Sequence, residues 1–310
     1  MKSKKTRFLI SLSCVLIFIF STLIGGYILI DKLLVSKYFG AYGINNLKQL
    51  VNLVTTIYSI PNEKDFITNP YTKADSTSLT TKFTEAGFPT LSNGEIDYEA
   101  IGRGEYERHP EESFIENSLT LSDKEIASFM SQILESGVLI SNFPDLTYID
   151  TLKMEVKQVT ITPKTKIEES STDEISYYKK DASFYITIKI DTSSAKQQIA
   201  ENIDAPKFLV DWIIPEVMYI SASFDASLNY QWEIENTGLA INSKTAKQSE
   251  VLLSLLLSFI YPESENMTID ELSTQLASLV FAGLDIIGSF DFISYQTGQN
   301  QTNGIKLYLK

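Results

Sequence analysis

Side chains that commonly act as bases, nucleophiles or metal ligands are scarce in this chain of 310 residues. It has one histidine, His109, and one cysteine, Cys14. Histidine is the commonest general base, and thiolate nucleophiles, disulfides and zinc clusters need cysteines, so these classes of site are nearly excluded. His109 lies in GEYERHPEE, among acidic residues and before a proline, which favours a solvated loop residue over a proton-transfer group. Cys14 lies within an apolar run, which favours a small apolar side chain facing lipid or a partner helix.

Motifs for phosphate binding and for hydrolysis are also missing. The sequence contains no glycine-rich phosphate loop, no HExxH and no GxSxG. Paired carboxylates could still serve a glycosidase, and Asp145 with Asp150 or Glu111 with Glu112 would be candidates, but no pair stands out. We therefore expect no enzymatic activity, no metal site and no cofactor.

An uncharged segment, Phe8 to Ile30, is the strongest signal in the chain. A helix rises about 1.5 Å per residue, so this segment is long enough for the roughly 30 Å hydrocarbon layer of a bilayer. The basic residues before it are Lys2, Lys4, Lys5 and Arg7. They predict a signal-anchor with residues 1–7 in the cytoplasm and the rest outside the cell membrane. The alternative is a cleaved signal peptide, for which Ser21, Gly25 and Gly26 offer a poor cleavage site.

The charge of the chain separates this anchor from the part that follows. Residues 1–30 contain four of the 26 basic residues and no acidic residue. Residues 31–310 therefore carry 22 basic and 39 acidic residues. An exterior with a net charge of −17 repels nucleic acid, which we exclude as a partner. Because an extracytoplasmic domain with no disulfide is typical of bacteria, we expect a protein of the bacterial cell envelope.

Residues 31–113 are expected to form a helical and irregular juxtamembrane region. In INNLKQLVNLVTTIY, apolar residues recur at helical spacing, and Pro61 ends the pattern. This helix is either a stalk or a helix packed on the main domain. Further on, Asp75 is expected to cap a short helix that carries Leu79 and Phe83 and stops at Gly87.

A capping box marks the start of the main domain, residues 114–310. Ser122 and Glu125 have the spacing at which each side chain accepts from the other residue's backbone N–H. The helix that follows should end at Gly137. Its apolar face consists of Ile126, Phe129, Met130, Ile133 and Leu134. A second capping box is expected at Thr268–Glu271, after a buried helix at Val251–Tyr261.

Alternating segments predict a mainly antiparallel sheet that covers these helices. The first, Leu152 to Ile161, changes phase near Gln158, as across a β-bulge, and the second is Phe184 to Ile190. The longest, Met218 to Ile234, keeps one phase throughout and predicts a single long, curved strand, with a hairpin near Asp225 as the alternative. Asn236-Thr237-Gly238 should make the next turn. Two further strands, Asp285–Tyr295 and Ile305–Leu309, should form a hairpin around TGQNQTNG.

The expected fold is therefore α+β, with an N-terminal transmembrane helix and a curved, mainly antiparallel sheet packed on amphipathic helices. The segments LTLSDKEIASFMSQIL, SFYITIKI and MYISASFDASLNYQWEI resemble bacterial membrane-anchored domains of the tubular lipid-binding (TULIP-like) group. The resemblance covers roughly Ser118 to Lys310 and is one of pattern, so no binding residue is carried over. It implies a capped helix lying in a long rolled sheet.

Two functions fit this pattern. In the first, the space between sheet and helices stays open as a groove for a lipid or another apolar ligand. Its expected lining is Ile126, Phe129, Met130, Phe224, Leu228 and Leu256. In the second, the interior is an ordinary filled core, and the domain is a structural or interaction subunit that docks another membrane or envelope protein. The sequence leaves both open.

Overall fold

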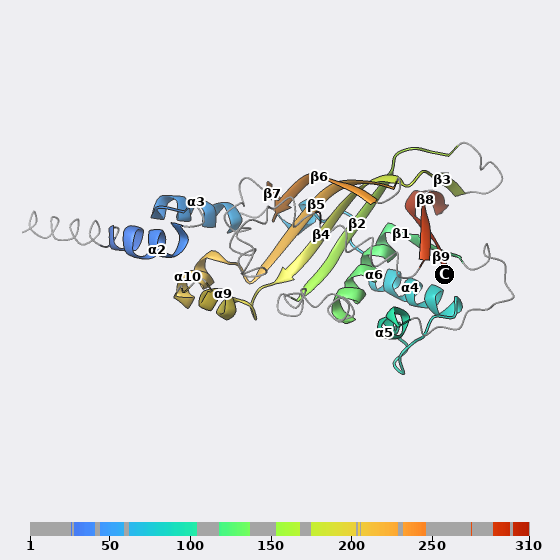
Figure 1. Ribbon diagram of the computed structural model, residues 1–310, viewed down its shortest axis with the longest axis horizontal. Helices are drawn as coiled ribbons and strands as arrows, with labels where there is room; N and C mark the ends of the chain where they lie inside the picture. Colours follow the sequence, from blue (N-terminus) through green and yellow to red (C-terminus); the bar gives the residue numbers. More distant parts are fainter. Residues whose placement is uncertain are drawn as a thin grey trace, which may run out of the picture.

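The computed structural model shows an α+β protein with two antiparallel β-sheets (Figure 1). The predicted fold class is confirmed at this level. The structure describes residues 26, 28–40, 44–58, 62–103, 118–136, 153–167, 175–202, 204, 206–228, 232–245, 274, 288–297 and 300–309.

The helices cluster in three parts of the chain. The first part contains the π-helix η1 (Ile30–Val35), α2 (Ser36–Phe39) and α3 (Leu47–Tyr58). The second contains the 3-10 helix η3 (Glu63–Asp65), α4 (Lys73–Glu85), α5 (Tyr98–Gly102) and α6 (Asp123–Ser136). The third contains α9 (Lys196–Asn202) and α10 (Lys207–Ile213).

The larger sheet has the order β2–β4–β5–β6–β7 and the smaller one β1–β9–β8–β3. The strands of the larger sheet are β2 (Met154–Pro163), β4 (Asp181–Asp191), β5 (Val217–Leu228), β6 (Trp232–Ile241) and β7 (Lys244–Thr245). Those of the smaller sheet are β1 (Ser118–Ser122), β3 (Ile175–Tyr178), β8 (Gly288–Thr297) and β9 (Asn300–Leu309). Figure 1 shows α2, α3, α9 and α10 at one end of the larger sheet, and α4, α5, α6 and the smaller sheet toward the other.

The predicted bulge in the first long strand is confirmed. The register between β2 and β4 shifts between Val156 and Gln158, so one residue of β2 has no opposite partner. Because of the extra residue, Gln158 lies opposite Thr187, on the face of the sheet away from Val156 and Val159, and residues 62–72 cover it there so that it is only 2 % exposed. Its carboxamide oxygen accepts from the backbone N–H groups of Thr68 (2.8 Å) and Asn69 (3.1 Å). The bulge therefore fastens residues 62–72 to the sheet.

The predicted single strand from Met218 to Ile234 is wrong, because β5 and β6 form an antiparallel pair. Leu228 lies opposite Trp232, so the strands are separated by three residues, 229–231. Cross-strand partners point to the same face of a sheet. With an odd number of residues between them, even-numbered residues stay on one face in both strands, and the alternation passes through the reversal unchanged. The alternative, a hairpin, is therefore correct, but the chain reverses after Leu228 and not near Asp225.

The predicted turn at Asn236-Thr237-Gly238 is also wrong. These residues lie inside β6, where a register shift opposite Ser223 and Phe224 interrupts the pairing. The chain reverses instead between β6 and β7, at Asn242 and Ser243, whose φ angles are +47° and +64°. Two consecutive left-handed residues are typical of a tight hairpin turn, and asparagine tolerates this conformation well.

The capping box of α6 is confirmed, and α4 carries one that the sequence analysis missed. The Ser122 hydroxyl accepts from Glu125 N–H at 3.2 Å, and the Glu125 carboxylate accepts from Ser122 N–H at 2.8 Å. In α4, Thr72 is the N-cap and Asp75 occupies its third helical position, whereas Asp75 was expected to be the cap. The helix contains Leu79 and Phe83, as predicted, and Gly87 follows it with a φ of +83°.

The predicted helix between residues 31 and 58 consists of two pieces packed on the domain. The Asp31 carboxylate accepts from the backbone N–H of Leu47 at the start of α3. Val35, Phe39 and Leu50 are fully buried together with residues of α9, α10 and β5. Of the two alternatives, packing on the main domain is therefore correct.

The C-terminal hairpin is confirmed, with a shorter connection than expected. β8 and β9 pair from Gly288–Leu309 to Thr297–Asn300, so most of the predicted loop belongs to β9. β1, which the sequence analysis did not predict, pairs with β9. Gly304 allows this approach, because a Cβ atom there would lie 2.0 Å from the Leu121 carbonyl oxygen.

Several predicted features lie outside the described residues. They are Cys14, His109, Glu111, Glu112, Asp145, Asp150, the helix Val251–Tyr261, the capping box Thr268–Glu271, and nearly all of the predicted anchor Phe8–Ile30. Among the described helices, none has the length and apolarity needed to cross a bilayer.

Two hydrophobic clusters form the interior. The first joins η1, α2 and α3 to α9, α10 and the adjacent ends of β2, β4 and β5. The second joins α4, α5 and α6 to both sheets, and includes Leu79, Phe83, Phe129, Phe184 and Phe290. Segment 62–103 therefore contributes to the same interior as the residues after Ser118.

Candidate functional site

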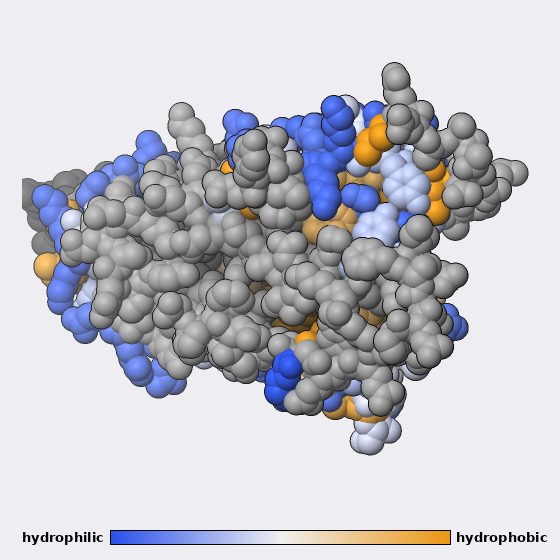
Figure 2. Space-filling view, turned by 45° about the vertical axis from the view of Figure 1, so that its right-hand side comes forward, coloured by the Kyte–Doolittle hydropathy of each residue, from blue (hydrophilic) through white to orange (hydrophobic). Residues whose placement is uncertain are grey.

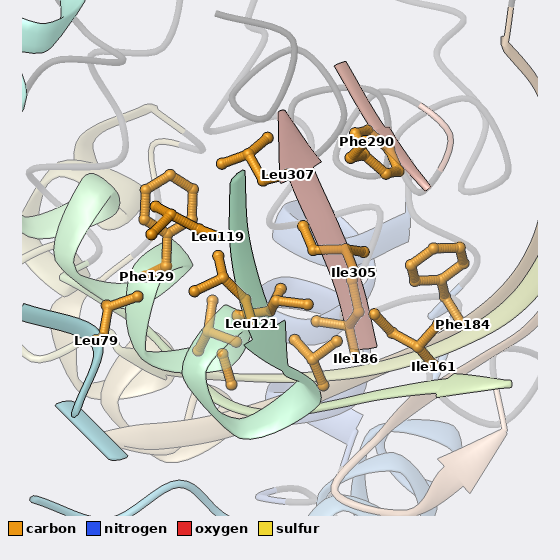
Figure 3. Close-up of a cluster of buried hydrophobic side chains, with 14 of the residues drawn as sticks. Leu79, Leu119, Leu121, Phe129, Ile161, Phe184, Ile186, Phe290, Ile305 and Leu307 are labelled. Atoms are coloured by element: carbon orange, nitrogen blue, oxygen red, sulfur yellow. The ribbon is translucent and has the colours of Figure 1, made fainter. Parts of the chain in front are cut away.

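Three of the six expected groove residues lie together in the second hydrophobic cluster. Ile126 and Phe129 of α6 are 1 % exposed, and Phe224 of β5 is 3 % exposed. Figure 3 shows side chains from α4, α6, β1, β4 and β9 converging around this position. The spacing of the capped helix and the alternation of the strands correctly placed these side chains on inward faces.

Aromatic contacts fill the space between these residues and their neighbours. The ring centroid of Phe129 lies 5.6 Å from that of Phe83 and 5.7 Å from that of Tyr98. Phe224 stacks on Phe184, with 5.0 Å between centroids. Such contacts are typical of a packed core.

The other three expected residues are less closely defined. Met130 is partly buried and packs against the second cluster. Leu228 ends β5, and its side chain is not among those described, while Leu256 lies outside the described residues. The structure therefore does not bring all six residues together around one space.

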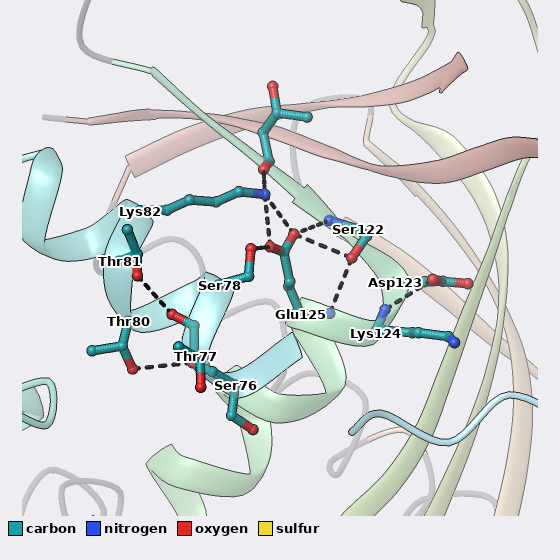
Figure 4. A network of polar contacts seen from close by, with 11 residues as sticks. Ser76, Thr77, Ser78, Thr80, Thr81, Lys82, Ser122, Asp123, Lys124 and Glu125 are labelled. Atoms are coloured by element: carbon teal, nitrogen blue, oxygen red, sulfur yellow. Dashed lines mark hydrogen bonds and ion pairs between the residues drawn. The ribbon is translucent and has the colours of Figure 1, made fainter. Parts of the chain in front are cut away.

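A polar network surrounds Glu125 at the start of α6 (Figure 4). Glu125 is 4 % exposed, and its carboxylate accepts from the Ser78 hydroxyl at 2.6 Å and from the Lys82 ammonium at 2.7 Å, besides its bond to Ser122 N–H. The Lys82 ammonium also donates to the carbonyl oxygen of Thr120 at 2.7 Å. The network thus joins α4, β1 and the N-terminus of α6, and every bond serves to hold these elements together.

The sequence signalled only half of this network. Ser122 and Glu125 form a recognisable local motif, whereas Ser78 and Lys82 are more than 40 residues away and carry no motif of their own. Their spacing of four residues, which puts both on one face of α4, was the only available clue.

Two open hollows lie beside β2, and none of the six expected groove residues lines either. The larger, of about 600 Å³, is lined by residues 62–76 together with Glu155 and Lys157. The smaller, of about 490 Å³, is lined by Glu135, Lys153, Glu155 and Lys189 among others. Glu155 separates the two; it pairs with Lys157 and accepts a hydrogen bond of 3.4 Å from the Tyr71 hydroxyl.

Burial and neighbouring charges shift the pKa values of several groups near these hollows. The pKa of the Glu135 carboxyl is raised, first by burial and then by the nearby Glu155 charge. The pKa of Tyr219 is raised to about 12, first by burial and then by Glu63. No group of three or more histidine, cysteine or acidic side chains suited to a metal ion occurs in the part of the chain that the structure describes. Mixed charges in open hollows suit contacts with a polar surface better than enclosure of an apolar ligand.

The N-terminal helix changes from exposed to buried within a few residues. Ile28, Leu29 and Leu33 are more than half exposed, whereas Val35 and Phe39 are fully buried in the first cluster. On the side of the molecule drawn in Figure 2, hydrophilic residues cover most of the described surface near this end. Exposed apolar side chains at Ile28, Leu29 and Leu33 are thus followed within a few residues by side chains of the core.

Along Trp232–Glu235, the edge of β6 that faces away from β5 pairs with no strand among the described residues. β6 pairs with β5 along its length, but β7 pairs only with Ala240 and Ile241. Glu233, Glu235 and Thr237 are exposed along the rest of β6. An unpaired edge presents backbone N–H and carbonyl groups to which another strand can bind.

Comparison with known proteins found no matching family model, no similar curated protein and no similar solved structure. The function proposed below therefore has its support in this chain's own residues.

Proposed function

We propose that this chain is a non-catalytic protein of the cell envelope, anchored in the membrane by Phe8–Ile30, whose extracytoplasmic domain docks another membrane or envelope protein. The observation that carries the proposal is the burial of η1 and α2 residues in the domain core directly after the predicted anchor. Val35 and Phe39 are buried only five and nine residues after Ile30. A domain joined in this way has a fixed orientation to the bilayer, which suits presentation of a surface to a neighbouring protein.

The interior supports docking in preference to an apolar ligand groove. Ile126, Phe129 and Phe224 contact other side chains on a scale typical of a filled core. The edge of β6 offers a place for a partner strand, and the acidic side chains of Glu233 and Glu235 beside it favour a partner with basic residues.

Anchoring and orientation can be tested with single cysteines, because Cys14 is the only cysteine in the chain. In a Cys14→Ser background, Thr77→Cys places a thiol on the exposed side of α4, and Ser3→Cys places one before the apolar segment. The experiment uses intact cells in which a maleimide reaches the outer face of the cell membrane but does not cross it. The maleimide should label Thr77→Cys at once and Ser3→Cys only after lysis. Equal labelling of both, or label in a soluble fraction, would contradict an anchored ectodomain.

Docking can be tested with a photoreactive amino acid at Thr237 on β6, with Thr77 on α4 as the matched exposed control. We expect one dominant protein adduct from Thr237 that disappears when Glu233 and Glu235 are both changed to lysine. The same adducts from both positions would argue against a docking edge. A lipid that co-purifies with the full chain in native mass spectrometry, and is lost in Phe129→Ala, would instead support the ligand groove.

A further inference from the structure

Helix α10 presents two aromatic side chains to the outside at the end of the molecule where α2 and α3 lie (Figure 1). Phe208 is 61 % exposed and Trp212 is 42 % exposed. They are four residues apart, so they lie on one face of the helix. The opposite face packs on the domain core, where Leu209, Val210 and Ile213 are buried in the first hydrophobic cluster.

Only a short stretch of chain separates this cluster from the end of the predicted anchor. Val35, which belongs to the same cluster, follows Ile30 by five residues, a rise of no more than about 7.5 Å. The headgroup layer on each side of the hydrocarbon is roughly 5–7 Å thick. Figure 1 shows α10 at the same end of the larger sheet as α2 and α3. If Ile30 ends the buried part of the anchor, the elements of this cluster lie at the level of the headgroups.

Charge is distributed in the way that a lipid surface favours. Residues 31–58 contain three lysines and one aspartate, whereas residues 59–310 contain 19 basic and 38 acidic residues. The Asp31 carboxylate is used at the N-terminus of α3, where it accepts from Leu47 N–H. On α10 itself, Lys207 and Asp211 form an ion pair of 2.7 Å and leave the helix with no net charge. Residues 196–216, which include α9 and α10, add two lysines and four acidic residues, so this end carries five basic and five acidic residues and is neutral on a strongly acidic molecule.

We propose that α10 is a second membrane contact, in which Phe208 and Trp212 enter the headgroup–acyl boundary of the leaflet that the anchor leaves. Aromatic side chains are favoured at this depth, because their rings are apolar and the indole N–H can still reach water or a headgroup. Contact at two points would fix the tilt of the domain as well as its distance from the bilayer. This inference rests on the proposed anchoring, and its test separates the two.

The chain contains only two tryptophans, which provide both probe and control. Trp212 lies at the anchor end, and Trp232 is the first residue of β6, opposite Leu228 at the far end of β5. The 12 residues of β5 span roughly 35–40 Å at about 3.3 Å per residue. In Trp232→Phe the emission reports Trp212 alone, and in Trp212→Phe it reports Trp232 alone.

The experiment uses the full chain in vesicles of phosphatidylcholine and phosphatidylglycerol whose acyl chains carry bromine near the headgroup. We expect Trp212 to emit at a shorter wavelength than a tryptophan exposed to water, and to be strongly quenched by the brominated lipid. We expect Trp232 to be unquenched. Changing Phe208 to serine should relieve much of the quenching of Trp212. The chain should float with the vesicles in every variant, because the anchor is unchanged.

Flotation without quenching of Trp212 would overturn the α10 contact and leave the anchoring intact. Failure to float would instead refute the proposed function. Protection of Trp212 from iodide in the absence of quenching by lipid would mean that a protein surface, such as a second copy, covers α10, and this would also overturn the proposal.

Discussion

Replacing Phe129 with alanine measures whether the space between α6 and the sheets is filled. The Phe129 ring is 1 % exposed and contacts Phe83 and Tyr98 at centroid distances of 5.6 and 5.7 Å. Truncation of a buried phenylalanine to alanine costs about 3–5 kcal/mol, because transfer free energy and packing contacts are lost together. Against a typical total of about 5–15 kcal/mol, this is a large part of the stability of the domain.

The assay is urea unfolding of the full chain in mild detergent, followed by tryptophan fluorescence, together with the melting temperature. At about 2–4 °C per kcal/mol for a domain of this size, we expect a fall of roughly 6–20 °C. Met130→Ala on the same helix, where the side chain is only partly buried, should cost clearly less. A ring that lined an empty groove would contribute less than half of its burial energy, so a loss below about 1 kcal/mol for Phe129→Ala would refute a packed interior.

Three further predictions test particular contacts. In a double-mutant cycle, Lys82→Met and Glu125→Gln should couple by about 0.5–3 kcal/mol in urea unfolding, and additive effects would contradict the network that joins α4 to α6. Gly304→Ala should lower stability by about 1–3 kcal/mol or more, because its Cβ would meet the Leu121 carbonyl oxygen at 2.0 Å; Gly238→Ala, where the nearest side-chain atom is at 3.8 Å, is the control and should be tolerated. Hydrogen bonds from Lys164 and then Ser183 lower the pKa of Asp225, so its contribution to stability is present above about pH 4 and is lost as the pH falls through the folded-state pKa. Urea midpoints between pH 2 and 6 should therefore fall less steeply on acidification in Asp225→Asn than in the unaltered chain, and identical slopes would contradict this.

Local patterns in the sequence predicted the elements that depend on near neighbours. The Ser122–Glu125 capping box, the bulge before Gln158 and the strand Phe184–Ile190 follow from side-chain chemistry and alternation within a few residues. Periodicity alone could not reveal the β5–β6 reversal, because three intervening residues preserve the phase of the alternation.

Long-range partners account for the other failures. β1 is a strand because β9, nearly 190 residues later, pairs with it, and Glu125 is buried because Lys82 and Ser78 approach from α4. No local pattern in the sequence links β1 to β9, or Glu125 to Ser78 and Lys82. For the candidate site, the sequence correctly placed Ile126, Phe129 and Phe224 on inward faces, whereas the packing that surrounds them depends on α4 and the smaller sheet. The exposure of Phe208 and Trp212 likewise depends on which face of α10 its neighbours cover.

The central claim is that the N-terminal helix mounts the domain rigidly on the membrane. Its most direct test is the distance between spin labels at Ile28→Cys, on the exposed start of the helix, and Thr237→Cys, on β6, in a Cys14→Ser background in lipid nanodiscs. Burial of Val35 and Phe39 in the core predicts a single narrow distance distribution, unchanged between detergent and nanodisc. A broad distribution, as from a flexible stalk between residues 28 and 40, would contradict the claim.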